Sequence, residues 1–306
     1  MLDSTKLHGI LPALVTPVKA DDTIDTAAAE ALFAWLQKQG VDGVVPLGGT
    51  GEYGALSRRE RIRFVEMSAK AFGGKSPVIP GVLDPGFHDA MDSAREFAAA
   101  GADALLVITP YYTNPTQAGI RDYFLRYADQ SPVPILIYEI PYRTRIAIDP
   151  EILHELSGHE KIIGMKACNT DMYHYLRVMA GLSPDFTMLS GEDSLFPLHV
   201  AAGAKGGIVV TANLVPKVWR RMFDLAVSGK TVEALALHQD LIPFMNLAFA
   251  ETNPGPMKSV MDLIGVNAPS MLAPLRQPKT ELQAALRKEC SRLLEKYEAV
   301  EAKLAS

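Results

Sequence analysis

The sequence predicts an α/β fold, a (β/α)8 TIM barrel with a C-terminal helical extension, and three observations favour it. The chain has 306 residues, and a barrel of this kind takes about 250, which leaves room for an extension. Short apolar runs recur along its first two-thirds and, as in residues 104–108, are apolar almost throughout, which is typical of parallel strands covered on both faces. Helical patterns separate these runs, so that strand and helix alternate.

The apolar runs are the expected strands. They begin near Ile10, Val41, Val78, Ala104, Ile135, Ile162, Phe186 and Gly207. This number of strand–helix units within about 220 residues fits a closed barrel. The alternative is an open, doubly wound sheet, because eight parallel strands could also remain open.

Apolar spacing and capping residues indicate the helices. Residues 29, 32, 33 and 36 follow the i, i+3, i+4, i+7 pattern of a buried helix face, and Gly40 supplies a stop. Ser57 and Glu60 have the spacing of a capping box, and Asp149 followed by Pro150 predicts another helix start.

Beyond Leu214 the sequence predicts helices and no further strand, the last helix running from about Thr280 to Ala305. No low-complexity linker separates this part from the rest. We therefore expect a barrel over residues 1–228 and a helical extension over residues 229–306 that packs on it.

Composition narrows the function classes. A net charge of −5 gives no basic surface for nucleic acid, and no apolar run reaches the roughly 18 residues that a membrane span needs. The start of the chain lacks a signal-peptide core, so we expect a cytoplasmic protein. Cys168 and Cys290 are too few for a disulfide framework or a zinc site, and the histidines form no close metal-ligand pair. Neither a metal nor an organic cofactor is expected.

Polar, aromatic and glycine residues gather where the expected strands end, which is the face on which barrel active sites form. These segments are residues 48–52, 109–112, 138–143, 165–166, 190–193 and 206–211. Lys166 ends the apolar run that starts at Ile162, where an ammonium group is poorly solvated. Desolvation favours the neutral amine, which is the nucleophile that forms a Schiff base with a carbonyl substrate. Lys205 lies at the opposite mouth and Lys258 in the extension, so position selects Lys166.

Together these strand ends resemble those of the pyruvate-dependent class I aldolases, the superfamily typified by dihydrodipicolinate synthase and N-acetylneuraminate lyase. The resemblance covers nearly the whole chain, including residues 253–258. It implies that Lys166 is the Schiff-base lysine and that Tyr138 is the tyrosine that shuttles protons beside it. An enzyme of this kind needs no cofactor, because the iminium formed on the lysine is the electron sink.

The same resemblance implies further roles. Thr50, with nearby backbone N–H groups of the loop at Gly49, would hold the pyruvate carboxylate, and the carbonyl of Ile208 would face the bound pyruvate. Tyr112 matches a tyrosine that family members insert into the site of a neighbouring subunit. A homo-oligomer is therefore expected, either a dimer or, following the family, a dimer of dimers that makes a homotetramer.

Arg143 bears on specificity, because a guanidinium grips a carboxylate with two parallel hydrogen bonds. In the family an arginine at this place binds the carboxylate of aspartate semialdehyde. The resemblance therefore implies a lyase that condenses pyruvate with this aldehyde, a 4-hydroxy-tetrahydrodipicolinate synthase. Its partners would be small keto-acid and aldehyde substrates.

Two positions depart from the family pattern. Gly49 replaces a hydroxyl residue that links two tyrosines into a proton relay, so that Tyr138 and Tyr112 would have no bridge unless a water fills the gap. Glycine at this place is similar to the loop of keto-deoxy sugar-acid dehydratases, so the alternative is such a dehydratase or a 2-keto-3-deoxy acid aldolase. Glu139 replaces a common asparagine, and alternation along the strand suggests that it points away from Tyr138. Where some synthases bind lysine as a feedback inhibitor, this chain has Arg58, Arg61, Pro85 and Asp89, so we expect no inhibition by lysine.

Three other functions remain open. Residues 49–54 match the dinucleotide fingerprint G-x-G-x-x-G, which would make the protein an oxidoreductase, but they follow the second expected strand and no acid ends the next one. The others are a metal-dependent aldolase and a binding protein that has kept the barrel and lost turnover.

Overall fold

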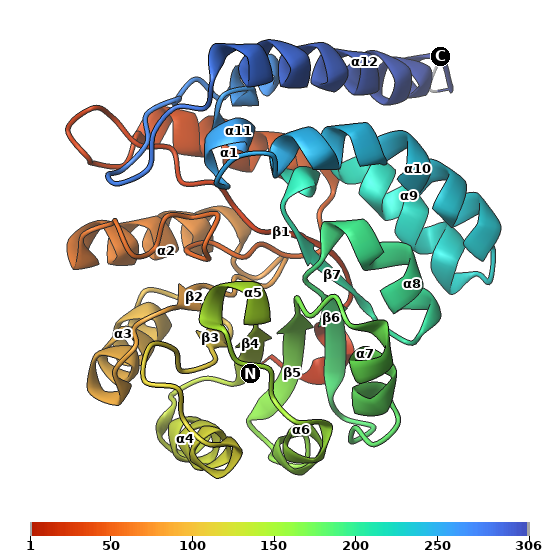
Figure 1. The fold of residues 1–306 in the computed structure, drawn as a ribbon. Helices are drawn as coiled ribbons and strands as arrows, with labels where there is room; N and C mark the ends of the chain where they lie inside the picture. The colour runs from red at the N-terminus through yellow and green to blue at the C-terminus, as the bar shows by residue number, and fades with distance from the viewer. Residues whose placement is uncertain (1, 305–306) are drawn as a thin grey trace.

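The computed structural model describes residues 2–304, with side chains as far as residue 297, and confirms the predicted barrel fold (Figure 1). Its strands are all parallel and lie in the order β1-β7-β6-β5-β4-β3-β2. They are β1 (Gly9–Pro12), β2 (Gly81–Val82), β3 (Leu105–Ile108), β4 (Ile135–Glu139), β5 (Ile162–Ala167), β6 (Thr187–Ser190) and β7 (Gly206–Val209).

A short extended segment closes the barrel between β1 and β2. Val45 forms a parallel bridge with Ala13, and Val44 forms one with Val78. The prediction of a full strand near Val41 is therefore wrong in extent, since only these isolated bridges form. Pro46 follows directly and has no N–H to continue a ladder. Because both neighbours are bridged, the sheet closes and the open-sheet alternative is also wrong.

Helices connect the strands and surround them on the outside of the barrel. They are α1 (Thr26–Gln39), α2 (Arg58–Phe72), α3 (Phe87–Ala99), α4 (Gln117–Gln130), α5 (Pro141–Thr144), α6 (Pro150–Leu156), α7 (Met172–Met179), α8 (Phe196–Ala201) and α9 (Pro216–Val227). Short 3-10 turns lie at η1 (Ser4–Lys6), η2 (Asp193–Leu195), η3 (Thr211–Asn213) and η4 (Met261–Ile264). Side chains of the strands are buried throughout, so the core lies inside the barrel and between the barrel and its helices.

The helix boundaries follow local chemistry, with two differences from expectation. Gly40 ends α1 in the left-handed conformation, at a φ of 69°, as predicted. The Ser57 hydroxyl accepts a hydrogen bond from the Glu60 N–H at 3.3 Å, but the Glu60 carboxylate turns to the Ile24 N–H at 2.9 Å, so only half of the capping box forms. At α6 the Asp149 side chain caps nothing, and the start depends on Pro150 at the first helical position.

The last quarter of the chain adds α10 (Thr231–Ala248), α11 (Gly255–Lys258) and α12 (Thr280–Leu304). In Figure 1 this part of the chain, drawn in cyan to blue, has α10 against α9 and α12 across the top. The last helix was expected to reach Ala305, which lies outside the described residues. Over the part of the chain that the structure describes, no helix is long and apolar enough to span a membrane.

Candidate active site

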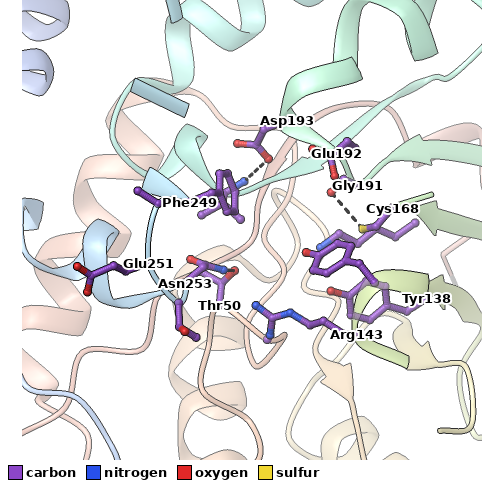
Figure 2. Close-up of a pocket in the computed structure, with 16 residues that line it drawn as sticks. Thr50, Tyr138, Arg143, Cys168, Gly191, Glu192, Asp193, Phe249, Glu251 and Asn253 are labelled. Carbon is purple, nitrogen blue, oxygen red and sulfur yellow. Dashed lines mark hydrogen bonds between the residues drawn. The ribbon is translucent and has the colours of Figure 1, made fainter. Parts of the chain in front are cut away.

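A cavity of about 630 Å³ opens at the C-terminal ends of the strands (Figure 2). It brings together five of the predicted site residues, which are Lys166, Tyr138, Thr50, Gly49 and Arg143. Its other lining residues are Tyr142, Cys168, Gly191, Glu192, Asp193, Val210 and residues 249–253. The strands supply the floor of the cavity, and the segment after α10 closes one side.

Lys166 and Tyr138 form the centre of this cavity. They are register partners on the adjacent strands β5 and β4, which makes their side chains leave the sheet on the same side. Lys166 is 5% exposed and Tyr138 is 4% exposed. The Lys166 Nζ lies 4.6 Å from the centre of the Tyr138 ring. An amine and a phenol are thus held together, both buried, in the lining of the cavity.

Burial determines the resting state of the Tyr138 phenol. Desolvation raises the pKa of Tyr138 well above its ordinary value, Cys168 adds to the rise, and the positive charge of Arg143 opposes it. The resting phenol is therefore neutral and can donate its proton. Several protons must move when an amine reacts with a carbonyl group. A neutral phenol can donate a proton in one step and, as phenolate, accept one in the next.

Gly191 and Cys168 pack against the stem of Lys166. A Cβ on Gly191 would lie 2.6 Å from the Lys166 Cγ and 2.9 Å from its Cε, so only glycine leaves the lysine its position. The Cys168 thiol donates to the Gly191 carbonyl at 3.1 Å, and burial raises the pKa of Cys168 to about 12. The thiol is neutral, and it fixes the turn that follows β6.

The Thr50 hydroxyl is oriented by a residue of the helical extension. Its Oγ1 accepts a hydrogen bond from the Asn253 Nδ2 at 2.8 Å, and both residues are buried. Since that bond uses the oxygen as acceptor, the Thr50 proton remains free to donate to a ligand. A hydroxyl that donates into the cavity is suited to a carboxylate.

A buried ion pair fastens the glycine-rich loop from behind. The Lys258 Nζ donates to the Glu52 Oε1 at 2.6 Å and to the Thr16 carbonyl at 2.9 Å. The Glu52 Oε2 also accepts from the Leu272 N–H at 2.8 Å. Burial lowers the pKa of Lys258, and the Glu52 carboxylate opposes that shift. The pair ties residues 48–52 to α11, so it holds Thr50 in place.

Two acidic residues, Glu192 and Asp193, line the cavity just after β6, while Glu251 lies apart from them, beside Asn253 (Figure 2). Asp193 accepts hydrogen bonds from the N–H groups of Val210 at 3.0 Å and Thr211 at 2.9 Å. Burial raises the pKa of Asp193 to about 6. Asp193 thus joins the segment after β6 to η3, while the Glu192 carboxylate accepts from the Ser194 hydroxyl at 2.7 Å and the Glu251 carboxylate accepts from the Lys279 N–H at 3.3 Å.

Three sequence-identified residues lie away from the cavity. Tyr112 is 91% exposed and has a φ of 73°. Ile208 is buried within β7, and Val210 lines the cavity in its vicinity. Glu139 is buried, accepts the Ile148 N–H at 3.0 Å and lies 3.6 Å from the His174 Nε2. It therefore points away from Tyr138, as the strand alternation predicted.

From the sequence, Tyr138 and Tyr112 have no bridge at Gly49 unless a water fills the gap there. A guanidinium takes that space instead, because a Cβ on Gly49 would lie 2.7 Å from the Arg143 Nη1. Arg143 belongs to α5, the short helix directly after β4. In Figure 2 its side chain points toward Thr50.

Several lining residues were not identified from the sequence. Cys168 lies two positions after Lys166 and could have been found from the period of two along a strand. Tyr142 belongs to the helix α5, so the period of a strand does not reach it, and residues 249–252 come from a helix end outside the barrel. Across the described residues, no group of three or more His, Cys, Asp or Glu side chains is placed to hold a metal ion.

Comparison with known proteins extends these observations. The sequence model of the Dihydrodipicolinate synthetase family matches residues 6–297. The chain is 36% identical to the 4-hydroxy-tetrahydrodipicolinate synthase of Acidiphilium cryptum, over 91% of this chain and 97% of that protein. It is 37% identical to the protein of the same name from Bradyrhizobium diazoefficiens, over 87% of this chain and 89% of the relative.

Solved structures agree with the sequence comparison. The crystal structure of dihydrodipicolinate synthase from Thermotoga maritima has a TM-score of 0.90 and 28% identity, and the match covers 94% of this chain and 98% of that one. A dihydrodipicolinate synthase variant described as monomeric has a TM-score of 0.91 and 28% identity, with 95% and 98% covered. The predicted family and enzyme class, a lyase of the class I aldolase type, are thereby confirmed. The chain belongs to the dihydrodipicolinate synthetase family.

Proposed function

We propose that the protein is a Schiff-base-forming lyase that condenses pyruvate with aspartate semialdehyde, a 4-hydroxy-tetrahydrodipicolinate synthase. The observation that carries this proposal is the buried pair of Lys166 and Tyr138, with the lysine Nζ 4.6 Å from the tyrosine ring. The names of the relatives support the choice of substrates.

In the proposed reaction the neutral amine of Lys166 attacks the ketone carbon of pyruvate, and loss of water gives an iminium. The positive iminium nitrogen withdraws electrons, so the methyl group loses a proton and an enamine forms. The enamine carbon then adds to the aldehyde carbon, whose oxygen takes up a proton. Attack of the substrate's own amine on the iminium carbon closes the ring and releases Lys166. Tyr138 moves the protons in these steps, because its neutral phenol is the adjacent acid.

Other residues complete the proposed site. Thr50 donates its hydroxyl proton to a carboxylate, Arg143 binds a carboxylate with its guanidinium, and the Ile208 carbonyl faces bound pyruvate. Tyr112 enters the site of a neighbouring subunit. Its 91% exposure, on the loop after β3, supports a contact of this kind.

The proposed assembly is a homo-oligomer, a dimer or a homotetramer built as a dimer of dimers, in the cytoplasm. One relative with the same fold is described as a monomeric variant, so the oligomeric state needs its own measurement. Within the chain we propose a catalytic barrel over residues 1–228 and an extension over residues 229–306. The hydrogen bond from Asn253 to Thr50 supports a role of the extension in the site.

Gly49 favours a second candidate, a 2-keto-3-deoxy acid aldolase or a keto-deoxy sugar-acid dehydratase of the same superfamily. A residue without a hydroxyl cannot link two tyrosines. The enzyme should therefore be assayed in both directions, by pyruvate consumption with aspartate semialdehyde and by pyruvate or water release from 2-keto-3-deoxy acids. Turnover highest with aspartate semialdehyde supports the synthase, while turnover only with the deoxy acids contradicts it.

A further inference from the structure

The Tyr138 phenol donates protons from a buried position, so solvent must be able to replace the protons that it gives. Its residue is 4% exposed, and a phenolate left at that depth is poorly solvated. A lyase of this class moves several protons in each turnover, and one of them goes to the oxygen of the aldehyde. The site therefore requires a second group that connects Tyr138 with solvent.

The connection expected from the sequence is interrupted at residue 49. Gly49 has no hydroxyl, and a Cβ there would lie 2.7 Å from the Arg143 Nη1, so a guanidinium takes that space. Tyr112 is 91% exposed and does not line the cavity of its own chain. A Tyr112 contributed by a neighbouring subunit would still lack the bridging hydroxyl at residue 49.

Tyr142 lies where a replacement for this connection is needed. It lines the cavity together with Tyr138 and Lys166. Its helix, α5, starts at Pro141, one residue after β4 ends. The Arg145 N–H donates to the Pro141 carbonyl at 2.8 Å and closes this helix. The tight turn holds Tyr142 beside the strand end that carries Tyr138.

The Tyr142 side chain spans the boundary between the cavity and solvent. The residue is 54% exposed, yet burial is the main cause that raises the pKa of Tyr142, and Cys168 and Tyr138 add to the rise. One side of the residue thus faces solvent, while its hydroxyl is desolvated within electrostatic reach of those two groups. The Arg143 Cζ lies 5.9 Å from the centre of the Tyr142 ring.

The two phenols are matched as partners for proton transfer. Burial raises the pKa of Tyr138 and that of Tyr142, and the positive charge of Arg143 opposes the rise at both. One guanidinium therefore stabilises a phenolate on either residue. A proton passes between two such groups at little cost in free energy, because neither is much the stronger acid.

Resting on the proposed function, we propose that Tyr142 carries protons between solvent and Tyr138, in place of a relay through residue 49. When the enamine adds to the aldehyde, the new alkoxide takes the proton of Tyr138. The Tyr138 phenolate then takes the proton of Tyr142, and Tyr142 takes one from water at the mouth of the cavity. Ring closure returns to solvent a proton from the substrate's ammonium group, so the protons balance. In aldol cleavage the same path runs outward.

Removal of one hydroxyl group tests this path. The variant is Tyr142→Phe, and Tyr173→Phe is the matched control, because Tyr173 is 72% exposed on α7 and does not line the cavity. Turnover of pyruvate with aspartate semialdehyde, and of 2-keto-3-deoxy acids, is measured at low buffer concentration and again with added imidazole, at constant pH and ionic strength. Imidazole is a small acid–base that can carry a proton to the cavity. Thermal unfolding midpoints and the amount of pyruvate trapped by borohydride at equilibrium show that each variant is folded and binds the keto acid.

We expect Tyr142→Phe to lower kcat by about tenfold at low buffer concentration. This is less than the loss of a direct acid–base group, because water at the mouth carries part of the proton flow. Imidazole should restore most of the lost turnover and should leave the wild type and Tyr173→Phe unchanged. A tyrosine that acts only through packing gives no such recovery. An unchanged kcat in Tyr142→Phe would overturn the proposal, and so would a loss that imidazole does not restore.

Tyr112→Phe separates this path from one that enters through a neighbouring subunit. The proposal expects that imidazole restores no turnover in Tyr112→Phe, whatever the size of the loss there. A loss in Tyr112→Phe that imidazole restores, with none in Tyr142→Phe, would overturn the proposal.

The outcomes also separate this inference from the proposed function. Turnover with 2-keto-3-deoxy acids alone, with a loss in Tyr142→Phe that imidazole restores, would contradict the synthase and support the proton path. Turnover with aspartate semialdehyde, with an unchanged kcat in Tyr142→Phe, would support the synthase and contradict the path.

Discussion

Among the side chains that the structure describes, two lysines are buried, Lys166 and Lys258, and their surroundings show that one serves the chemistry and the other supports the fold. Lys258 is 3% exposed, and its Nζ donates to Glu52 and to the Thr16 carbonyl. Lys166 is 5% exposed, lies over the Tyr138 ring and faces the cavity. In the described residues, the hydrogen bonds and ion pairs that hold Lys258 have no counterpart at Lys166.

The comparison shows that burial alone does not make a lysine a nucleophile. A carboxylate within hydrogen-bonding distance favours the ammonium form and occupies its protons, and that form cannot attack a carbonyl carbon. Lys258 therefore has a structural role, which is to hold the loop of residues 48–52 in place. Lys166 has an acid–base neighbour and a route for substrate, which are the two things that Lys258 lacks.

Removing the amine of Lys166 should have the largest effect on turnover. Lys166→Ala is expected to lower kcat by about 10⁴-fold or more, because no other group can form the covalent intermediate. The unfolding midpoint should change little, since no ion pair or hydrogen bond is lost. Steady-state kinetics and thermal unfolding on the same preparation check both parts. Substantial residual turnover would erase the distinction between the two lysines.

Removing the amine of Lys258 should instead lower the stability of the fold. Lys258→Met leaves the Glu52 carboxylate buried without a countercharge and should lower the free energy of unfolding by about 3–5 kcal/mol. Urea denaturation measures this change. Pairing it with Glu52→Gln should recover part of the loss, because the uncompensated charge is then gone. A loss of unfolding free energy below about 1 kcal/mol would show that the Lys258–Glu52 pair does not stabilise the fold.

Tyr138→Phe tests whether the neighbour of Lys166 is an acid–base group. Turnover should fall by about 10²-fold, the lower end of what a general acid–base contributes. The pyruvate adduct should still form, only more slowly, because the amine is intact. Tyr123→Phe is the control, as Tyr123 packs among aromatic rings outside the cavity. Equal effects of the two substitutions would argue that Tyr138 acts only through packing.

The smallest expected effect is on the pH dependence of stability, and it comes from a third buried basic residue, His199. Its Nδ1 lies 2.8 Å from the Ser190 Oγ, its ring stacks on Tyr175, and burial lowers its pKa to about 4. The unfolded chain takes up a proton near pH 6.5 and the folded chain does not, so stability is full above pH 6.5 and falls as the pH drops toward 4. The slope should be at most about 1.4 kcal/mol per pH unit.

Chemical denaturation of the wild type and of His199→Gln between pH 7 and pH 5 measures this slope. The variant should lack the contribution of His199 to the slope, whereas Asp193, whose pKa burial raises to about 6, titrates in both proteins. An identical slope in both proteins would assign the pH dependence to other residues.

Much of the barrel and the centre of the site could be predicted from the sequence. The apolar runs give the strands, and the ends of adjacent strands meet on one face, so Lys166 and Tyr138 were expected to be neighbours. The exception among the strands is the segment at Val44 and Val45, where Pro46 limits pairing to bridges.

The remaining features of the site depend on contacts that no local pattern encodes. The Arg143 guanidinium beside Gly49 depends on how a long side chain turns at the mouth of the cavity. The Asn253 bond to Thr50 depends on how the extension packs back on the barrel. Insensitivity to lysine as a feedback inhibitor stays a prediction. In the region that matches the inhibitor site of some synthases, Arg61 pairs with Asp84 at 3.1 Å and Arg58 pairs with Glu96 at 2.8 Å.

The most direct test of the account is reductive trapping of pyruvate with borohydride, followed by proteolysis and peptide mass spectrometry. The account predicts one reduced pyruvyl adduct, on the peptide that contains Lys166, and none on the peptide that contains Lys258. Lys166→Ala should show no adduct under the same conditions. An adduct on Lys258, or one that persists in Lys166→Ala, would contradict the assignment of the two lysines.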